Sequence, residues 1–366
     1  MKVQDVAAAI DHIAPREFAA EWDNVGLIVG DGQSPVSKLM LCIDLTHDVL
    51  AEANSINAQM VMSYHPPIFK PVATVTSSST PLVYEAIRRG LAVYSIHTAY
   101  DVVPGGVNDA LAGAMGLAAA EPLEHFNREW LCKITVFVPP DDLSRVSSAA
   151  FDAGAGRMGN YYDCSFFTRG IGSFCPTQDA NPTIGSAGKP ESVEELRLEF
   201  ISPCSVAGAV CAAVRGAHSY EEPAIDVVPM RQYPAGTGMG RIGKLDRPTK
   251  LSSLLSKIKQ STGVQTVLLA GAPRKDPTIR TVACGAGSCG SLYKRAISSG
   301  ADFYLTGEMR HHDALAAASG GMIVACLGHS NSERLALGPL AKRLGEMLAG
   351  LKIRLSKQDC DPFVVR

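Results

Sequence analysis

Several histidines and carboxylates in this chain follow short apolar runs, at spacings that suit metal binding. An imidazole nitrogen and a carboxylate oxygen together favour zinc, iron, manganese or nickel. The runs end in one or two such residues each, and a cluster of them would form a site for a divalent metal ion. The residues concerned are His65, His97 with Asp101, Glu308, and His329 with Glu333.

Each of these residues also has a simpler explanation. A histidine at the end of a strand is often only a hydrogen-bonded loop residue. Ser330 and Glu333 match a capping box, in which the glutamate would cap the start of a helix. Asp101 can be a turn residue ahead of Pro104-Gly105-Gly106. Spacing alone leaves these alternatives open.

A glycine-rich segment gives a second, different signal. Gly285, Gly287 and Gly290 match the pattern G-x-G-x-x-G between an expected strand and an expected helix, and Glu308 follows at roughly the 20-residue spacing of nucleotide-binding motifs. The pattern predicts contact with a phosphate, and the alternative is a turn that packs the helix on the strand. A second match at 238–243 leads into no helix, so we interpret it as linker.

The elements that would position these residues alternate between strand and helix in both terminal parts of the chain. This alternation predicts an α/β fold with a parallel sheet, whose ligands bind beyond the carboxyl ends of the strands. The candidate residues would then share one rim. Strands are expected at 39–43, 59–63, 91–96, 266–270, 281–284, 302–305 and 322–327, and helices at 47–54, 81–89, 291–298 and 332–348.

The middle of the chain has a different rhythm, in the order strand, helix, strand, strand, helix, strand. That order predicts an inserted ferredoxin-like domain. The chain would thus divide into a first core half at 1–125, the insert at 126–243 and a second core half at 244–366. The strands fall at 132–138, 163–168, 196–202 and 224–230, the helices at 143–152 and 205–217, with a loop at 175–190 and a flexible return at 233–243.

Composition narrows the classes of function. Among 366 residues, 34 Lys and Arg oppose 36 Asp and Glu, so no basic excess favours nucleic-acid binding. No apolar run reaches the roughly 20 residues of a membrane helix, and the charged N-terminal pattern is that of an ordinary helix rather than a signal peptide. The 10 cysteines form no Cys-x-x-Cys pair. We therefore expect a cytoplasmic protein with reduced thiols and no membrane partner.

Five motifs in order give the chain a family resemblance. They are Trp22-Asp-Asn-Val-Gly-Leu27, Ser63-Tyr-His-Pro-Pro-Ile-Phe69, His97-Thr-Ala-Tyr-Asp101, Thr306-Gly-Glu-Met-Arg-His-His-Asp313 and Gly328-His-Ser-Asn-Ser-Glu333. Together they resemble the Ngg-interacting-factor-three family, whose members are described as GTP cyclohydrolase I type 2 homologues. The insert, with Gly159-Asn160-Tyr161 and Ser219-Tyr-Glu-Glu-Pro223, resembles the PII/CutA-like domain of longer members.

The resemblance implies a dinuclear metal centre in a ring-shaped homohexamer, with one or two divalent ions per chain. Its ligands would be His65, Asp101, His329 and a bridging Glu333, with His97 as a further candidate. This chain has Tyr64 beside His65 where many bacterial members have a second histidine. A phenol is a poorer neutral ligand than imidazole, so the second ion would bind weakly or not at all.

The resemblance also implies a reaction, the hydrolytic opening of the imidazole ring of GTP. In such a metal-dependent hydrolase, Glu308 or His97 would move protons and the loop Gly285–Gly290 would hold the triphosphate. The alternative is a non-enzymatic scaffold or transcriptional co-regulator, stabilised by the metal, that binds protein partners.

Overall fold

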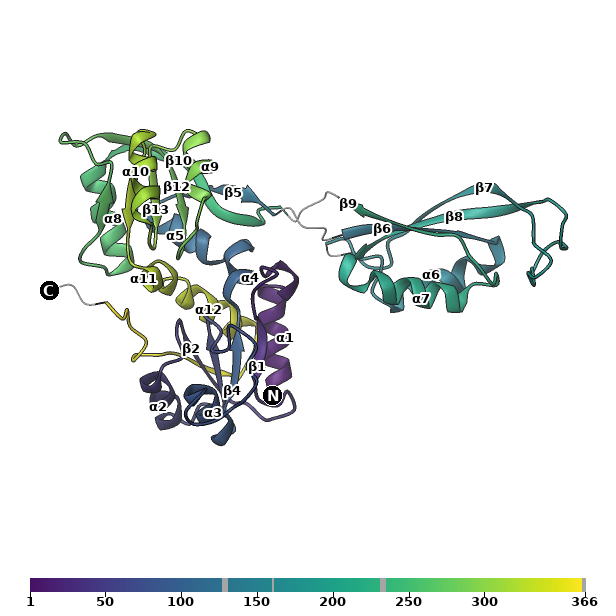
Figure 1. Cartoon of the computed structure of the whole chain (residues 1–366), viewed down its shortest axis with the longest axis horizontal. Coiled ribbons are helices and arrows are strands. Elements are labelled where there is room, and N and C mark those ends of the chain that lie inside the picture. The colour runs from purple at the N-terminus through teal and green to yellow at the C-terminus, as the bar shows by residue number, and fades with distance from the viewer. Residues whose placement is uncertain (127–130, 160, 231–234, 364–366) are drawn as a thin grey trace. The chain divides into compact units, whose positions relative to one another are not determined.

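The computed structural model describes residues 1–126, 131–159, 161–230 and 235–363. The chain divides into two compact units (Figure 1): unit 1 comprises Met1–Phe126 with Ala235–Arg366, and unit 2 comprises Asn127–Pro234. Asn160 of the insert motif and residues 233–234 of the expected flexible return lie outside the described residues.

The first sheet of unit 1 is mainly parallel. Its order is β1-β4-β3-β2-β15, and only the edge strand β1 runs antiparallel to its neighbour among the described residues. β3 and β4 are buried at every position because helices cover both faces of the sheet. The bounds are Gly26–Val29 (β1), Lys38–Cys42 (β2), Met60–Ser63 (β3), Ala92–Ser95 (β4) and Lys352–Leu355 (β15).

Four helices cover this sheet. α2 (His47–Ser55) and α3 (Pro81–Arg88) pack on one face, where Met40, Val61 and Val93 meet their apolar sides. α1 (Val3–Ile13) contacts β1 and α12 (Leu337–Met347), and α12 contacts β2 and β15. Two local features define where these helices begin. Thr46 Oγ1 accepts a hydrogen bond from Val49 N at the start of α2, and Pro81 is the first residue of α3.

The second sheet of unit 1 is mixed. Its order is β11-β14-β13-β12-β10-β5, with β12, β13 and β14 parallel and the other strands antiparallel to their neighbours. The bounds are Glu121–His125 (β5), Gly238–Lys250 (β10), Leu268–Ala270 (β11), Thr278–Gly285 (β12), Phe303–Thr306 (β13) and Ile323–Cys326 (β14).

Helices also flank the second sheet. α9 (Leu292–Ser298) and α10 (His311–Ser319) share an apolar cluster with β12, β13 and β14. α5 (Val107–Met115) contacts β10, β12 and α8 (Leu251–Thr262). The remaining helices of unit 1 are short and lie near the strand ends: η1 (Arg16–Phe18), α4 (His97–Val102) and α11 (His329–Arg334).

The interpretation of 238–243 as linker is wrong. These residues form the start of β10, which pairs with β5 and β12. Arg241, which is only 1% exposed, forms hydrogen bonds to both carboxylate oxygens of Asp109 at 2.7 Å and to the carbonyls of Gly238 and Gly240. The glycines let the backbone curl around this guanidinium; Gly240 has φ +62° and no room for a Cβ.

The single helix expected at 332–348 is two helices, α11 and α12. Pro339 explains the break, because it lacks an N–H group and its ring would clash with the carbonyl four residues earlier. The new helix instead begins at Leu337 and takes Pro339 into its first turn, where proline is tolerated.

Unit 2 follows the order strand, helix, strand, strand, helix, strand. Its antiparallel sheet has the order β7-β8-β6-β9. α6 and α7 pack on this sheet around Ile134, Val136, Leu198 and Phe200. The bounds are Leu131–Val138 (β6), Pro140–Asp142 (η2), Leu143–Asp152 (α6), Phe166–Phe174 (β7), Glu191–Pro203 (β8), Cys204–Val206 (η3), Ala207–Ala217 (α7) and Ile225–Met230 (β9).

In the described parts of both units, no helix combines the length and the apolarity that crossing a bilayer requires.

Candidate metal centre

His65 is held just beyond the end of β3. The backbone N–H groups of Tyr64 and His65 continue the ladder to β2, donating to Cys42 O at 2.9 Å and Ile43 O at 3.0 Å. Pro66 and Pro67 come next and have no N–H to donate, so the ladder stops there. His65 therefore stands at the carboxyl end of the first sheet.

His329 and Glu333 come from α11, which follows β14 of the second sheet. Gly328, with φ +94°, turns the chain from β14 into the helix. The two residues are four apart and so lie on one face of α11. The capping-box alternative is wrong: the helix already begins at His329, and the Ser330 hydroxyl bonds to Asp361 instead of a backbone N–H.

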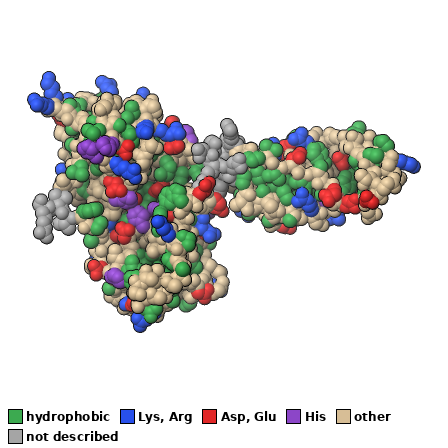
Figure 2. All heavy atoms as spheres, in the orientation of Figure 1, with side chains coloured by type: hydrophobic (Ala, Val, Ile, Leu, Met, Phe, Trp, Pro, Cys, Tyr) green, Lys and Arg blue, Asp and Glu red, His purple; other side chains and the backbone are tan. Residues whose placement is uncertain are grey.

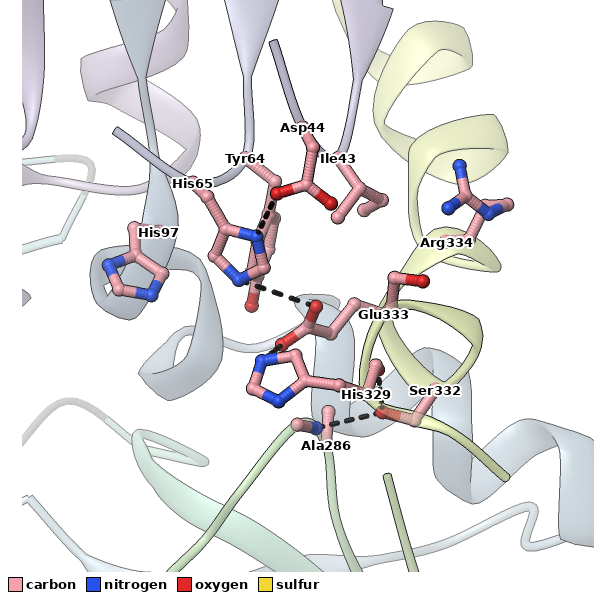
Figure 3. Close-up of polar contacts among 12 residues, drawn as sticks. Ile43, Asp44, Tyr64, His65, His97, Ala286, His329, Ser332, Glu333 and Arg334 are labelled. Atoms are coloured by element: carbon pink, nitrogen blue, oxygen red, sulfur yellow. Dashed lines mark hydrogen bonds and ion pairs between the residues drawn. The ribbon is translucent and has the colours of Figure 1, made fainter. Parts of the chain in front are cut away.

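The three side chains meet (Figure 3). One ligand atom from each of His65, His329 and Glu333 lies within 4.8 Å of the others. Glu333 lies between the two rings, with Oε2 at 3.5 Å from His65 Nε2 and Oε1 at 3.3 Å from His329 Nε2. The cluster thus joins one histidine from the first sheet to a histidine and a glutamate that follow the second.

Both histidines are oriented through their other ring nitrogen. His65 Nδ1 is 2.9 Å from Asp44 Oδ1, and His329 Nδ1 is 3.1 Å from Glu308 Oε1. A carboxylate at Nδ1 keeps the proton there and turns Nε2 toward the third ligand. Metal-binding histidines almost always have this second partner, and both have it here.

Burial and charge at Glu333 complete the case that these residues fit a metal ion. Glu333 is 4% exposed, and its Oε2 has no hydrogen-bond partner in the described part of the chain. Burial alone would raise its pKa, but the nearby imidazoles of His329 and His65 hold the pKa below its usual value. A buried, anionic oxygen facing two imidazole nitrogens is the environment that a divalent cation fills.

The pKa values of both histidines are raised, as the pKa of Glu333 is lowered. Burial lowers the pKa of His65, but Asp44 and Glu333 outweigh it and raise the pKa to about 10. Glu333 and Glu308 raise the pKa of His329 to about 9. Without metal both rings are therefore cationic at neutral pH, and an entering cation takes the place of their Nε2 protons.

The glycine-rich loop packs directly on this cluster. A Cβ at Gly287 would lie 2.5 Å from Glu333 Oε1 and 3.2 Å from His329 Nε2. The N–H groups of Ala286 and Gly287 already donate to Asn108 Oδ1 (2.9 Å) and Ser332 Oγ (2.8 Å). Phosphate contact through Gly285, Gly287 and Gly290 stays a prediction. Residues 288–291 of this loop line a cavity of about 280 Å³.

Asp101 lies outside the group of three. Its Oδ1 accepts a hydrogen bond from the buried Tyr64 hydroxyl. Burial raises the pKa of Asp101 to about 6 despite that bond, and Glu333 adds to the effect. Burial and the same carboxylates raise the pKa of Tyr64 well above its usual value. The assignment of Asp101 as a ligand stays a prediction.

His97 stands beside His65, with ring centroids 5.1 Å apart (Figure 3). Its backbone has φ +23°, rare for a residue with a side chain, and its Nδ1 is 2.7 Å from Asp23 Oδ1. Burial raises the pKa of Asp23, but hydrogen bonds from His97 and Thr98 outweigh it and keep that pKa low. A strained backbone is usually retained where function requires it, so the strain at His97 indicates that the site depends on the position of its imidazole ring.

Two exposed aromatic side chains adjoin His97. Trp22 is 62% exposed and Phe69 is 50% exposed, and their ring centroids are 5.7 Å apart. They lie 6.0 and 6.3 Å from the His97 ring. Figure 2 shows histidine and acidic side chains together near the middle of the visible face of unit 1.

The expectation of one sheet with one rim is wrong. β3 and β4, which precede His65 and His97, belong to the first sheet, whereas Glu308 and His329 follow strands of the second. Because His65 follows β3 and contacts Glu333, which follows β14, the carboxyl ends of the two sets of parallel strands face each other at this cluster.

Two residues that contact the candidate site, Asp44 and Asn108, were not predicted from the sequence. Asp44 follows the buried run Leu39–Ile43, which is the same signal that identified His65, and it could have been found. Asn108 gave no such signal. It is buried on α5, where its Nδ2 donates to Asp101 O at 2.8 Å while its Oδ1 holds the glycine-rich loop.

Comparison with known proteins identifies the family of this chain. A family model described as Duf34/NIF3 (NGG1p interacting factor 3) matches residues 1–362. The chain belongs to this family. The resemblance drawn from the five motifs is thereby confirmed.

Relatives of this Duf34/NIF3 protein match over most of their length. A Bacillus subtilis protein is 34% identical over 366 residues, covering 98% of this chain and 97% of the relative. A Mycobacterium leprae protein is 36% identical over 324 residues, covering 86% and 82%. Both relatives are named GTP cyclohydrolase 1 type 2 homolog.

Solved structures agree with the fold. The crystal structure of a Bacillus cereus protein related to NIF3 has a TM-score of 0.79 at 32% identity, covering 100% of this chain and 99% of that one. A Staphylococcus aureus protein has a TM-score of 0.81 at 25% identity with the same coverage.

Proposed function

We propose that unit 1 binds a divalent metal ion through His65, His329 and Glu333. The observation that carries this proposal is the pairing of each histidine with a carboxylate at Nδ1 while both Nε2 atoms face the buried Glu333. Imidazole and carboxylate donors suit zinc, iron, manganese or nickel. Asp101 is the further ligand for a second ion.

We further propose that this centre catalyses hydrolysis of a nucleotide such as GTP. The name GTP cyclohydrolase 1 type 2 homolog, borne by the relatives, supports this class of reaction. When bound, the ion would supply a Lewis acid that polarises substrate oxygen and acidifies water. In ring opening, the oxygen of water adds to C8 of guanine while N7 takes up one proton; the C8–N9 bond then breaks, N9 takes up the second proton, and C8 becomes the carbon of a formyl group on N7.

Residues of this chain would bind and orient such a nucleotide. The exposed rings of Trp22 and Phe69 offer faces on which a purine can stack, next to the metal centre. A cavity of about 280 Å³, whose lining includes Glu308 and Arg310, would take the phosphates, because a guanidinium is a suitable partner for them. His97 and Glu308 are the groups placed to give or take the proton at N9.

Metal analysis tests the first proposal. Purified wild-type protein should retain metal, and His329→Ala and Glu333→Gln should lose most of it while keeping their far-UV circular dichroism spectrum. His311→Ala is the matched control, because this exposed histidine begins α10 and lies outside the cluster. Metal content near wild type in both variants would contradict the ligand assignment.

A substrate screen tests the second proposal. Turnover of GTP or another nucleotide should stop when a chelator is added and return when the metal is restored. Trp22→Ala should raise KM more than it lowers kcat, since stacking acts mainly on binding. Metal binding without any nucleotide turnover, together with capture of specific protein partners, would favour the scaffold or co-regulator instead.

The resemblance supports two further proposals about organisation. We propose that the protein assembles as a homohexamer, which light scattering coupled to size-exclusion chromatography measures. We also propose that unit 2 is a ferredoxin-like domain, supported by its order of elements and by the sheet order β7-β8-β6-β9.

A further inference from the structure

Unit 2 contains a cavity of about 560 Å³ that is separate from the candidate metal centre. Its size falls in the range of roughly 300–1,000 Å³ that is usual for sites of organic ligands. It lies between the end of β7, the loop that follows β7 and the segment after α7. All its walls come from unit 2.

Most of the wall is apolar. Phe137 comes from β6, Phe174 ends β7, and Pro176, Pro182 and Ile184 come from the loop. Such a lining suits the body of a small organic molecule, because apolar surface leaves water when the molecule enters.

Hydrogen bonds hold the loop in place over the cavity. Asn181 N donates to Glu221 Oε1 at 3.0 Å, and Thr183 Oγ1 donates to Ser219 O at 2.7 Å. Ser219 N in turn donates to Asp142 Oδ2 at 2.9 Å. The cavity is therefore a built feature in which loop and sheet are tied together.

One buried carboxylate faces this space. Glu195 lines the cavity and is 9% exposed. Its side chain lies across Gly172 on the neighbouring strand, where a Cβ would come within 2.1 Å of Oε2. No basic side chain forms an ion pair with Glu195 anywhere in the described residues. A cation that enters the cavity would therefore find the carboxylate of Glu195 without a competing basic side chain from the described residues.

Tyr220, which lies near Glu195, and His218, which lies beside Tyr220, do not supply a positive charge. His218 Nδ1 accepts a hydrogen bond from Tyr220 N at 3.0 Å, so Nε2 carries the proton and donates to Phe137 O at 2.9 Å. Both ring nitrogens of His218 are thus engaged with backbone groups and face away from an incoming ligand. The Tyr220 hydroxyl is buried next to the Glu195 carboxylate and carries no charge. Burial and the nearby Glu195 raise the pKa of Tyr220 to about 12.

We propose that this cavity binds a small organic cation, in which an amidinium, guanidinium or ammonium group is attached to an aromatic or aliphatic body. The cation would pair with Glu195 and the body would fill the apolar part. Glu221 and Glu222 add negative charge to the lining, whereas no Lys or Arg belongs to it, so phosphates and carboxylates are excluded. The proposal is independent of the metal centre in unit 1.

Two probes of the same shape test the charge requirement on the full chain. 4-Aminobenzamidine is cationic, and 4-aminobenzamide is its neutral counterpart. Calorimetry should show saturable binding of the amidine, at least tenfold tighter than the amide. Equal affinities, or no saturable binding of the amidine, would overturn the proposal.

A thiol reports where the probe binds. Cys175 is exposed at the edge of the cavity, and Cys360 is exposed in unit 1. Saturating amidine should slow alkylation of Cys175 by iodoacetamide at least threefold and leave Cys360 unchanged, as read by peptide mass spectrometry. Binding that does not protect Cys175 would place the probe elsewhere and overturn the proposal.

Variants test the residue. Glu195→Gln should weaken amidine binding at least tenfold without affecting the amide. Glu194→Gln is the matched control: it is the preceding residue on β8, points to the other face and pairs with Arg169. If Glu195→Gln fails to fold, Tyr220→Phe is the second variant. It removes only the buried hydroxyl that lies near Glu195 in the cavity wall, and it should weaken amidine binding at least threefold. Wild-type amidine affinity in Glu195→Gln, or in Tyr220→Phe where Glu195→Gln does not fold, would contradict the site.

Discussion

At Gly287 the backbone runs so close to the candidate ligands that a side chain does not fit. A Cβ there would lie 2.5 Å from Glu333 Oε1. Gly287→Ala should therefore push Glu333 or His329 out of position and reduce retained metal at least fivefold, measured by elemental analysis after desalting. This result would also mean that the glycine-rich loop serves the metal centre through close packing.

Gly290→Ala is the control for this change. Gly287 has φ +63° and Gly290 has φ +51°, so alanine suffers a similar backbone penalty of about 1–2 kcal/mol at either position. A Cβ at Gly290, however, meets nothing within 4 Å. Equal metal loss in both variants would show that backbone strain, rather than contact with Glu333, is responsible.

Tyr64 decides how many ions the centre can hold. Its buried hydroxyl donates to Asp101 and its raised pKa keeps it protonated, so it is a poor ligand and it occupies an oxygen of Asp101. Tyr64→His should raise the metal bound per chain after incubation with excess ion and desalting. Tyr64→Phe, which offers no ligand atom, should not. Unchanged stoichiometry in a folded Tyr64→His variant would remove position 64 from the metal site.

The sequence reveals candidate ligands because a strand in a parallel sheet is apolar until it ends. His65, His329 and Glu333 stand out for that reason. What spacing cannot show is which neighbours they have. The roles of Asp44 and Glu308 at the two Nδ1 atoms depend on contacts across 21 residues in each case, and no local pattern encodes these contacts.

Among the elements, the buried parallel strands were predictable and several antiparallel strands were not. β3, β4 and β13 are buried at every position and read as apolar runs. β5 (Glu121–His125) contains a proline and β10 begins with Gly-Met-Gly. Such strands have no apolar run or clear alternation, so the sequence around residue 240 reads as a turn.

The buried Arg241 shows why that stretch is structural. Replacing it with methionine removes the guanidinium that donates to the carbonyls of Gly238 and Gly240 and to both oxygens of Asp109, of which Oδ2 keeps the N–H of Gly105 as a donor. Arg241→Met should therefore lower the free energy of unfolding by about 3–5 kcal/mol, measured by urea denaturation. Arg247→Met on the exposed part of the same strand should change it by less than about 0.5 kcal/mol. A loss at Arg241 no larger than that at Arg247 would contradict this role.

On the scale of the whole molecule, the α/β class of unit 1 follows from the alternation of strands and helices, but the number of sheets does not. Local periodicity reports that a strand is buried and says nothing about which strand it pairs with. Two sets of parallel strands fit the same alternating pattern as one. The candidate metal-binding cluster needs both sheets, since His65 comes from the first and His329 and Glu333 follow the second.

The two compact units can be separated by a defined excision. Unit 1 resumes at Ala235, and Gly238 pairs with His125 in the ladder of β5 and β10, so the cut ends lie close together. A chain that lacks 127–234, joined by a Gly-Ser-Gly linker, should fold and retain as much metal per chain as the full protein, because every candidate ligand remains.

The control is a wider excision that joins residue 125 to residue 244. It removes the first half of β10, and with it Arg241 and the pairing with β5. This chain should be insoluble or should unfold at a much lower temperature in a circular dichroism melt. A shorter excision that is folded and monodisperse yet free of metal would mean that unit 2 helps to build the centre. Equal melting temperatures for the two excisions would mean that residues 238–243 are dispensable for stability. That result would contradict the structural role assigned to the buried Arg241.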